Sequence, residues 1–127
     1  MRRSDGVFAY QLAVVVDDAR MGINEVVRGC DLLGSTPRQL WLQEELGYPH
    51  PSYYHLPLLT GADGRRLAKR NFDLDLAALR EDYTPEALIG KLAFLAGLLD
   101  REEPVKLSDL VEKFDWKLVK KDNILLK

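Results

Sequence analysis

The chain has 127 residues, and its 18 Lys and Arg against 20 Asp and Glu give a formal net charge of −2. This length is typical of one globular domain, and 46% hydrophobic with 30% charged residues exclude a disordered chain or a collagen-like repeat. No stretch approaches the roughly 18 uninterrupted apolar residues of a membrane span. Cys30 is the one cysteine of the sequence and therefore cannot form an internal disulfide or a structural zinc site, so we expect a cytoplasmic location.

The first half of the chain alternates predicted strands with a predicted helix. A run of mostly β-branched residues within Phe8 to Asp18 predicts a strand that is covered on both faces, as in a parallel sheet flanked by helices. Two further strands are predicted over Glu25 to Arg28 and Tyr53 to Leu58. These segments indicate an α/β fold.

A helix is predicted between the last two strands. Thr36 suits the N-cap position, and Pro37 suits the first helical position. Gln39 lies three residues after Thr36 and would complete a capping box. Gly47 suits the left-handed conformation in which many helices end. The positions expected to be buried are Leu40, Leu42 or Trp41, and Leu46.

The pattern changes after a turn-rich loop at Thr60 to Gly64. The run Arg65 to Arg70 holds four basic residues in six. Beyond it the spacing predicts only helices: one over Leu74 to Arg80, one capped by Thr84 and one capped by Ser108. The last helix is expected to bury Leu110, Val111 and Phe114.

Three sites in the first half carry side chains with binding chemistry, and each has a structural alternative. Asp17 and Asp18 end a predicted strand, where they either bind a metal or ribose or form a solvated strand stop. Arg28 ends the next strand, where its fork either grips a carboxylate with two hydrogen bonds or lies on the surface or beside Asp31. Tyr10 either offers its hydroxyl to a ligand or packs.

The basic loop is a candidate for phosphate binding, whereas the two histidines are not candidates for metal binding. The loop either neutralises a polyphosphate or is a solvated charged turn. His50 and His55 have no cysteine or carboxylate at ligand spacing, so we expect no metal site. The sequence also lacks a nucleophile elbow, a P-loop and a dinucleotide-binding motif.

Five strings, in order, give the chain a resemblance to a known family. They are YQLAVVVDD (10–18), VRGCDLL (27–33), STPRQ (35–39), HLPL (55–58) and DGRRLAKR (63–70). The chain resembles the class I glutamyl-tRNA synthetases and looks closest to the short glutamyl-Q tRNA(Asp) synthetase branch. The resemblance covers about residues 2 to 100, and the last string is similar to the family's Lys-Met-Ser-Lys-Ser loop.

The resemblance implies a ligase that uses ATP, with Mg²⁺, to activate glutamate and then transfers it to a tRNA, either tRNA-Glu or tRNA-Asp. Tyr10 and Arg28 match positions that bind glutamate. Asp31 matches an acidic position near the adenylate and the acceptor end.

The loop residues take their roles from the same resemblance. Lys69 matches the second signature lysine, a catalytic group that stabilises charge on the ATP phosphates. Arg66 stands in the place of the first lysine, Leu67 follows it, and Ala68 replaces the usual serine. We therefore expect Arg66, Leu67 and Lys69 to lie beside the ATP.

The resemblance also implies how the chain is divided. Residues 1–60 are expected to form the C-terminal half of a Rossmann-like catalytic domain with a parallel sheet and flanking helices. Residues 61–72 are expected to be the basic loop, and 73–127 a small, all-helical, stem-contact-like region.

One family signature does not occur in the sequence, namely the His-Ile-Gly-His-type motif that holds the adenine and phosphates. We therefore expect little activity from the chain alone, and either a separate N-terminal half or self-association through an exposed sheet edge. The family's zinc site is absent as well, and we expect no intrinsic cofactor and no membrane contact. The alternative is a non-catalytic, split or degenerate module that binds RNA, glutamate or a protein partner.

Overall fold

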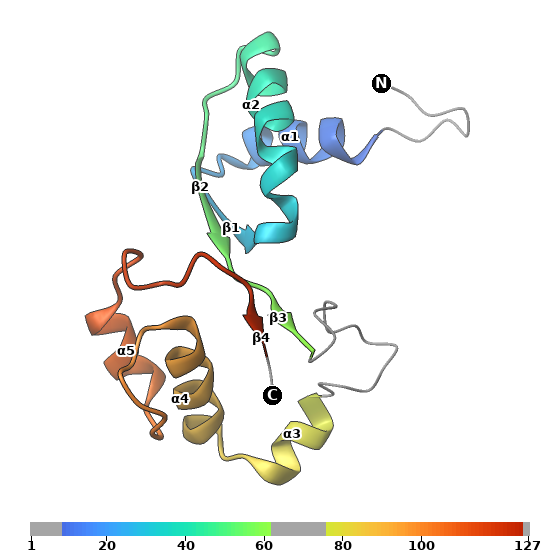
Figure 1. The fold of residues 1–127 in the computed structure, drawn as a ribbon. Helices are drawn as coiled ribbons and strands as arrows, with labels where there is room; N and C mark the ends of the chain where they lie inside the picture. The colour runs from blue at the N-terminus through green and yellow to red at the C-terminus, as the bar shows by residue number, and fades with distance from the viewer. Residues whose placement is uncertain (1–8, 62–75, 126–127) are drawn as a thin grey trace. The chain divides into compact units, whose positions relative to one another are not determined.

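The computed structural model describes residues 9–61 and 76–125, and the chain divides into two compact units, Met1–Leu56 and Pro57–Lys127 (Figure 1). The described residues of the first unit form two helices, a 3₁₀ helix and a pair of parallel strands. Those of the second unit form three helices and a shorter parallel pair. The predicted combination of helices with parallel sheet is confirmed.

The first described element of the first unit is a helix, α1 (Tyr10–Met21), so the prediction of a strand over Phe8 to Asp18 is wrong. The β-branched run lowers helix propensity by only a few tenths of a kcal/mol per residue, which packing easily exceeds. Val15 is 1% exposed on the packed face of this helix. Gly22 closes α1 with φ 69°, and the Ile23 N–H donates to the Asp18 carbonyl.

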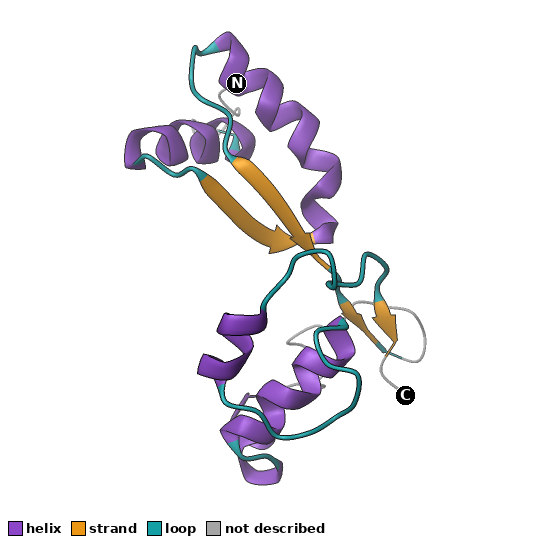
Figure 2. Ribbon diagram, turned by 90° about the vertical axis from the view of Figure 1, so that its left-hand side faces the viewer, coloured by secondary structure: helices purple, strands orange, loops and turns teal. Residues whose placement is uncertain are grey.

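Two parallel strands follow, β1 (Glu25–Gly29) and β2 (Ser52–Leu56) (Figure 2). Both are confirmed predictions with shifted ends: β1 runs one residue further, and β2 ends two residues earlier than expected. Their register places Arg28 opposite His55. Parallel strands need a long crossover, which η1 (Cys30–Ser35) and α2 (Thr36–Glu45) provide.

The helix α2 lies where the sequence predicts it, but its N-terminus is built differently. Ser35 is the N-cap, and no side chain caps the helix, so the predicted capping box is wrong. The hydroxyl of Thr36 and the amide of Gln39 bind groups elsewhere in the first unit instead. The predicted end is confirmed, because Gly47 has φ 68° and the Tyr48 N–H donates back to the Gln43 carbonyl.

The buried face of α2 is unexpectedly polar. Leu42 is buried as predicted, whereas Trp41 and Leu46 are exposed. The most buried side chains of this helix are Gln39, 1% exposed, and Gln43, 2% exposed. Residues four apart share one face of a helix, so the two amides point into the same interior.

The second unit contains one strand pair in addition to its predicted helices. The helices are α3 (Leu76–Asp82), α4 (Pro85–Ala96) and α5 (Leu107–Lys113). The strands β3 (Leu59–Thr60) and β4 (Ile124–Leu125) pair in parallel, so the region after the loop is not all-helical. The strand β4 is not predicted by the sequence because two residues are too few for a periodic pattern.

The helix caps of the second unit give one confirmed prediction and one wrong one. The Thr84 hydroxyl accepts a hydrogen bond from the Ala87 N–H at 3.2 Å, as predicted for α4. The N-cap of α5 is Lys106, and the Ser108 hydroxyl instead bonds to the Asp109 carboxylate. The expected burial of Val111 and Phe114 is also wrong, since both are exposed.

Candidate functional site

The site is built around the side chain of Arg28, which extends from β1 and is half-buried. Its Nε donates to Nε2 of His55 at 3.2 Å, and its Nη1 donates to Oε1 of Gln39 at 2.6 Å. Its Nη2 donates to the Thr36 hydroxyl at 2.7 Å and to the Leu32 carbonyl at 3.5 Å. All three nitrogens of the guanidinium are therefore held by the protein.

These acceptors share one property: each of them is uncharged. An imidazole, an amide, a hydroxyl and a backbone carbonyl orient the guanidinium without neutralising it. The Tyr53 ring lies 4.7 Å from the guanidinium carbon and adds a cation–π contact. The described surroundings of Arg28 therefore fix its position and leave its positive charge available to an anion.

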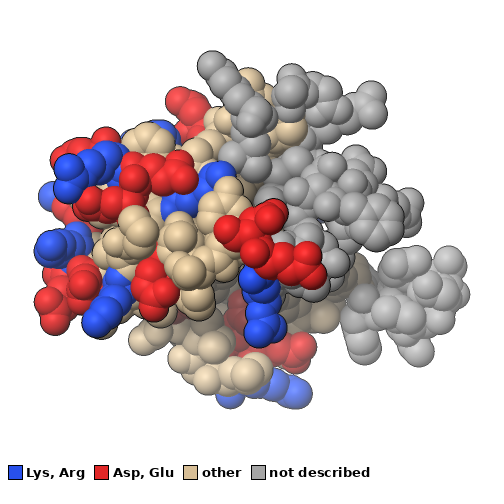
Figure 3. Space-filling view, turned by 90° about the horizontal axis from the view of Figure 1, so that it is seen from below, with Lys and Arg blue, Asp and Glu red and all other residues tan. Residues whose placement is uncertain are grey.

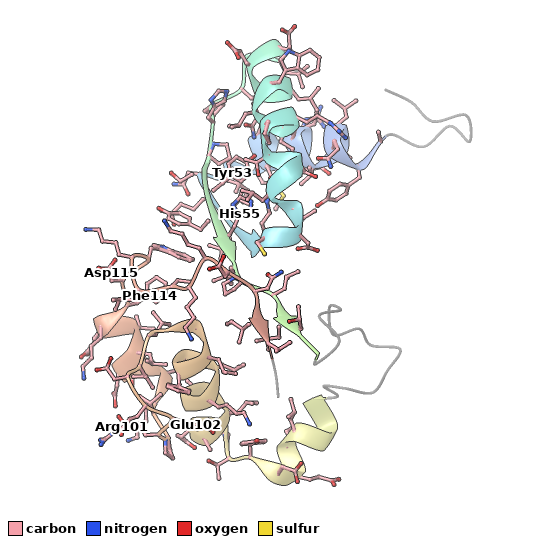
Figure 4. The ribbon with its side chains drawn as sticks, in the orientation of Figure 1. Tyr53, His55, Arg101, Glu102, Phe114 and Asp115 are labelled. Carbon is pink, nitrogen blue, oxygen red and sulfur yellow. The ribbon has the colours of Figure 1, made fainter. Side chains whose placement is uncertain are left out.

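His55 takes part in this arrangement as an acceptor. Its Nε2 also lies 3.2 Å from the Thr36 hydroxyl. Burial, and secondarily the positive charge of Arg28, lower the pKa of His55 below its ordinary value of 6.5. Figure 4 shows Tyr53 and His55 together on β2, and their rings stack with centroids 6.4 Å apart.

Further amide hydrogen bonds hold Gln39, one of the acceptors of Arg28. Gln39 uses its Nε2 to donate to Oε1 of Gln11 on α1 at 2.7 Å, and Gln11 donates in turn to the Ser35 hydroxyl at 3.0 Å. We call Gln11, Arg28, Thr36, Gln39, Tyr53 and His55 the Arg28 cluster. The cluster joins α1, β1, α2 and β2 through polar contacts.

One neighbouring group in this interior lacks a partner. Gln43 donates from Nε2 to the Tyr53 hydroxyl at 3.0 Å, but its Oε1 is buried with no hydrogen-bond partner among the described residues. An unpaired buried acceptor costs about 1–3 kcal/mol. The interior beside the Arg28 cluster is therefore not optimised for stability alone.

The spacing of residues within each element and the pairing of the two strands explain why these side chains meet. Tyr53 and His55 are two apart on a strand and face the same side, and the β1–β2 register aligns His55 with Arg28. Thr36 and Gln39, three apart in the first turn of α2, share one helix face. The crossover helix thus covers the sheet face that bears Arg28.

The predicted site residues are only partly brought together. Tyr10 is the first residue of α1 and 59% exposed, and it precedes Gln11, which connects through Gln39 to Arg28. Asp31 lies exposed on η1. The loop residues Arg66, Leu67 and Lys69 lie outside the described residues.

The aspartates do not have the setting that suggested a metal or ribose site. Asp17 and Asp18 lie within the helix α1 and not at the end of a strand. Among residues 9–61 and 76–125, no group of three or more His, Cys, Asp and Glu is arranged to hold a metal ion. Their predicted strand-end position is therefore wrong.

The sequence does not reveal His55, Thr36 and Gln39 as members of the site. A lone histidine invites only the question of metal binding, and the other two residues have the spacing of helix-capping groups. The signal that identifies them is the pairing of β1 with β2, which places a cation-bearing position directly opposite a histidine.

The distribution of charge on the surface and the length of the helices give two more observations. On the face displayed in Figure 3, acidic and basic side chains are interspersed, and the described part of that face shows no broad basic area. No helix in the described part of the chain is both long and apolar enough to cross a bilayer.

The sequence matches the family described as tRNA synthetases class I (E and Q), catalytic domain, over residues 1–126. It is 56% identical over 114 residues to a glutamyl-Q tRNA(Asp) synthetase from Symbiobacterium thermophilum, covering 89% of this chain and 35% of that protein. It is 46% identical over 115 residues to a glutamate–tRNA ligase from Geotalea uraniireducens, covering 90% of this chain and 25% of that protein.

The fold also matches a solved structure. A crystal structure of a glutamate tRNA ligase from Elizabethkingia meningosepticum, in complex with its amino acid, superposes with a TM-score of 0.78. The sequence identity is 29%, and the match covers 99% of this chain and 29% of that one. The chain therefore spans about a third or less of the length of these relatives.

Proposed function

Because the chain belongs to the family of class I tRNA synthetases for Glu and Gln, within the catalytic domain, we propose that it forms the glutamate-binding part of a glutamate–tRNA ligase. Such an enzyme joins the glutamate carboxylate to the α-phosphate of ATP, releases pyrophosphate, and then transfers the glutamyl group to tRNA. The names of the relatives and the chemistry of the Arg28 cluster support this proposal.

The observation that carries the proposal is that the described residues hold the Arg28 guanidinium through uncharged acceptors. This guanidinium carries a full positive charge, so a carboxylate ligand supplies a counter-charge. The contact to the Leu32 carbonyl, at 3.5 Å, is the longest of the four. An incoming carboxylate oxygen replaces this contact at the lowest cost.

The remaining roles are assigned by family resemblance. Tyr10 contributes its exposed hydroxyl to the same glutamate, and Asp31 lies near the adenylate and the acceptor end of the tRNA. Lys69, with Arg66 and Leu67, approaches the ATP phosphates, where a bound Mg²⁺ would add further charge neutralisation. We assign residues 61–72 to this loop, and residues 73–127 to contact with the tRNA stem, in the cytoplasm.

The first test is equilibrium dialysis of the chain against radiolabelled L-glutamate. We expect Arg28→Lys to weaken binding by about tenfold or more, because lysine keeps the charge but cannot hold the planar fork. The matched control is Arg38→Lys, since Arg38 is exposed on α2 and outside the Arg28 cluster. Equal glutamate affinity for the wild type and Arg28→Lys would remove Arg28 from the site.

A second measurement separates a ligase part from a module that only binds. We propose that these 127 residues alone give no glutamate-dependent ATP–pyrophosphate exchange, because phosphoryl chemistry needs positioned groups on both sides of the ATP. Exchange should appear when a polypeptide that carries the His-Ile-Gly-His-type motif is added. Vigorous exchange by the chain alone would contradict this division of the site.

A further inference from the structure

We propose that His55 is a positioning residue that, as a neutral imidazole, orients the Arg28 guanidinium for its carboxylate ligand, so that protonation of His55 weakens glutamate binding. The inference rests on the proposed function, because the ligand is the glutamate assigned to Arg28. It adds a pH-sensitive group that itself never touches the substrate.

The geometry fixes the protonation state of the ring. A guanidinium only donates hydrogen bonds, so the contact of 3.2 Å between Arg28 Nε and His55 Nε2 requires a lone pair on Nε2. The proton of the neutral ring must then be on Nδ1. The hydroxyl of Thr36 accepts from Arg28 Nη2 at 2.7 Å and lies 3.2 Å from the same Nε2, and its own proton can point to the Leu32 carbonyl at 3.5 Å while Nε2 accepts from Arg28.

The contact with His55 controls the orientation of the guanidinium plane. Gln39 and Thr36 hold the two terminal nitrogens, while His55 holds Nε, the atom next to the flexible side-chain stem. Contacts to three different nitrogens fix the plane of the guanidinium. Contacts to only two nitrogens would let the guanidinium rotate about the line that joins them. Losing the His55 contact therefore loosens the guanidinium without removing it from the site.

Protonation converts this contact from attraction to repulsion. A proton on Nε2 removes the acceptor that Arg28 uses and turns it into a second donor. It also places an imidazolium beside the guanidinium with no carboxylate between them in the described contacts. Both effects displace the guanidinium from the position in which it meets a ligand.

The surroundings set the direction of the pH dependence. Burial first, and Arg28 second, keep the pKa of His55 below its ordinary value of 6.5. The neutral form therefore prevails at and above neutral pH, and the contact is lost as the pH falls through this lowered pKa. The ionisable groups of the neighbouring elements are Glu25 and Arg28 on β1, Tyr53 and Tyr54 on β2, Cys30 and Asp31 on η1, Arg38, Glu44 and Glu45 on α2, and Tyr10, Asp17, Asp18 and Arg20 on α1.

The experiment measures glutamate affinity at a series of pH values from about 7.5 down to about 5, where the glutamate side chain remains mostly ionised, and NMR follows the ionisation of the His55 ring over the same range. We expect the wild type to lose about tenfold in affinity on acidification, as for a hydrogen bond to a charged group. His55→Gln keeps an acceptor but does not titrate, so it should bind like the wild type at about pH 7.5 and lose much less on acidification. His55→Leu should be about tenfold weaker at both pH values.

The chain offers a matched control in its other histidine. His50 is exposed in the segment before β2 and outside the Arg28 cluster, so His50→Gln should keep the full wild-type pH dependence. If His55→Gln loses as much affinity as the wild type on acidification, the inference is overturned. It is overturned equally if His50→Gln abolishes the pH dependence.

A readout without ligand separates this inference from the proposed function. In ¹⁵N NMR of the wild type, the Arg28 Nε–H resonance should shift with the titration of His55, and the ring should show the Nδ1–H tautomer. Absence of glutamate binding at any pH would refute the proposed function and leave this test intact. An Arg28 resonance that ignores the His55 titration would overturn the positioning role.

Discussion

A guanidinium that is half removed from water is stabilised by a nearby anion, because burial weakens its hydration. Arg28 instead has an amide, a hydroxyl, an imidazole and an aromatic ring as its described neighbours. This arrangement rigidifies the cation before a ligand arrives. The entropy cost of ordering the long side chain is then met during folding and not during binding.

The neighbouring pair Gln43 and Tyr53 allows a prediction about stability. Tyr53→Phe leaves the buried Gln43 amide without its described partner, so we expect a loss of about 1–3 kcal/mol in the free energy of unfolding. The double variant Tyr53→Phe with Gln43→Met replaces both polar groups by apolar ones and should recover most of that loss. Urea denaturation measures both.

The control for this pair is the single variant Gln43→Met, which completes a double-mutant cycle. It removes the unpartnered Oε1 but also deprives the Tyr53 hydroxyl of its neighbour. Strictly additive effects of the two substitutions would show that the pair is not coupled.

At the scale of single residues, the sequence predicts the central cation but not its partners. Arg28 is identifiable because an arginine ends a predicted strand immediately before a glycine. Its acceptors Thr36, Gln39 and His55 lie 8, 11 and 27 positions further along the chain. Only the crossover helix and the parallel pairing bring them together, and neither is a local property of the sequence.

The elements themselves divide into those with clear end signals and those without. The start of α4 is marked correctly by Thr84 and Pro85, and the C-terminal end of α2 by Gly47, because the effect of these residues on the backbone is local. The segment Phe8 to Asp18 misleads because a β-branched run is common to buried strands and to packed helices. Burial of Val15 by the rest of the unit decides the outcome.

Gly90, in the middle of α4, gives a prediction in which helix propensity and packing disagree in sign. Propensity alone predicts that Gly90→Ala stabilises the helix by about 1 kcal/mol. A Cβ at this position would, however, overlap the backbone carbonyl of Glu103, which cannot easily move. We therefore expect a loss of about 2–3 kcal/mol in the free energy of unfolding, measured by thermal or urea denaturation.

Gly22 is the matched control, because a Cβ there meets nothing within 4 Å. We expect Gly22→Ala to lower the free energy of unfolding by about 1 kcal/mol, only because alanine is strained in the left-handed backbone at φ 69°. A gain of stability in Gly90→Ala would contradict the close packing of α4 against the segment at Glu103.

At the scale of the whole molecule, the β1–β2 pair has one face turned away from the Arg28 cluster. The side chains on that face include Val27, 53% exposed, and Leu56, 38% exposed. Parallel sheets are ordinarily covered on both faces, and within the described part of the chain no third strand pairs with β1 or β2. A surface of this kind favours contact with another polypeptide.

We therefore expect the purified chain to self-associate in a concentration-dependent way. Sedimentation velocity should show a species larger than the monomer as the concentration rises. Val27→Lys places a charge on the exposed face and should shift the equilibrium toward monomer. A strict monomer over a wide concentration range would rule out this prediction.

The central claim is that Arg28, held in place by uncharged neighbours, neutralises a carboxylate of glutamate. The most direct test is ¹⁵N NMR of the Arg28 side chain during titration with L-glutamate at neutral pH. We predict a saturable shift of the Arg28 N–H resonances, with no comparable shift at the exposed Arg38. Arg28 resonances that stay unmoved while glutamate binds elsewhere on the chain, or that respond no more than those of Arg38, would contradict the claim.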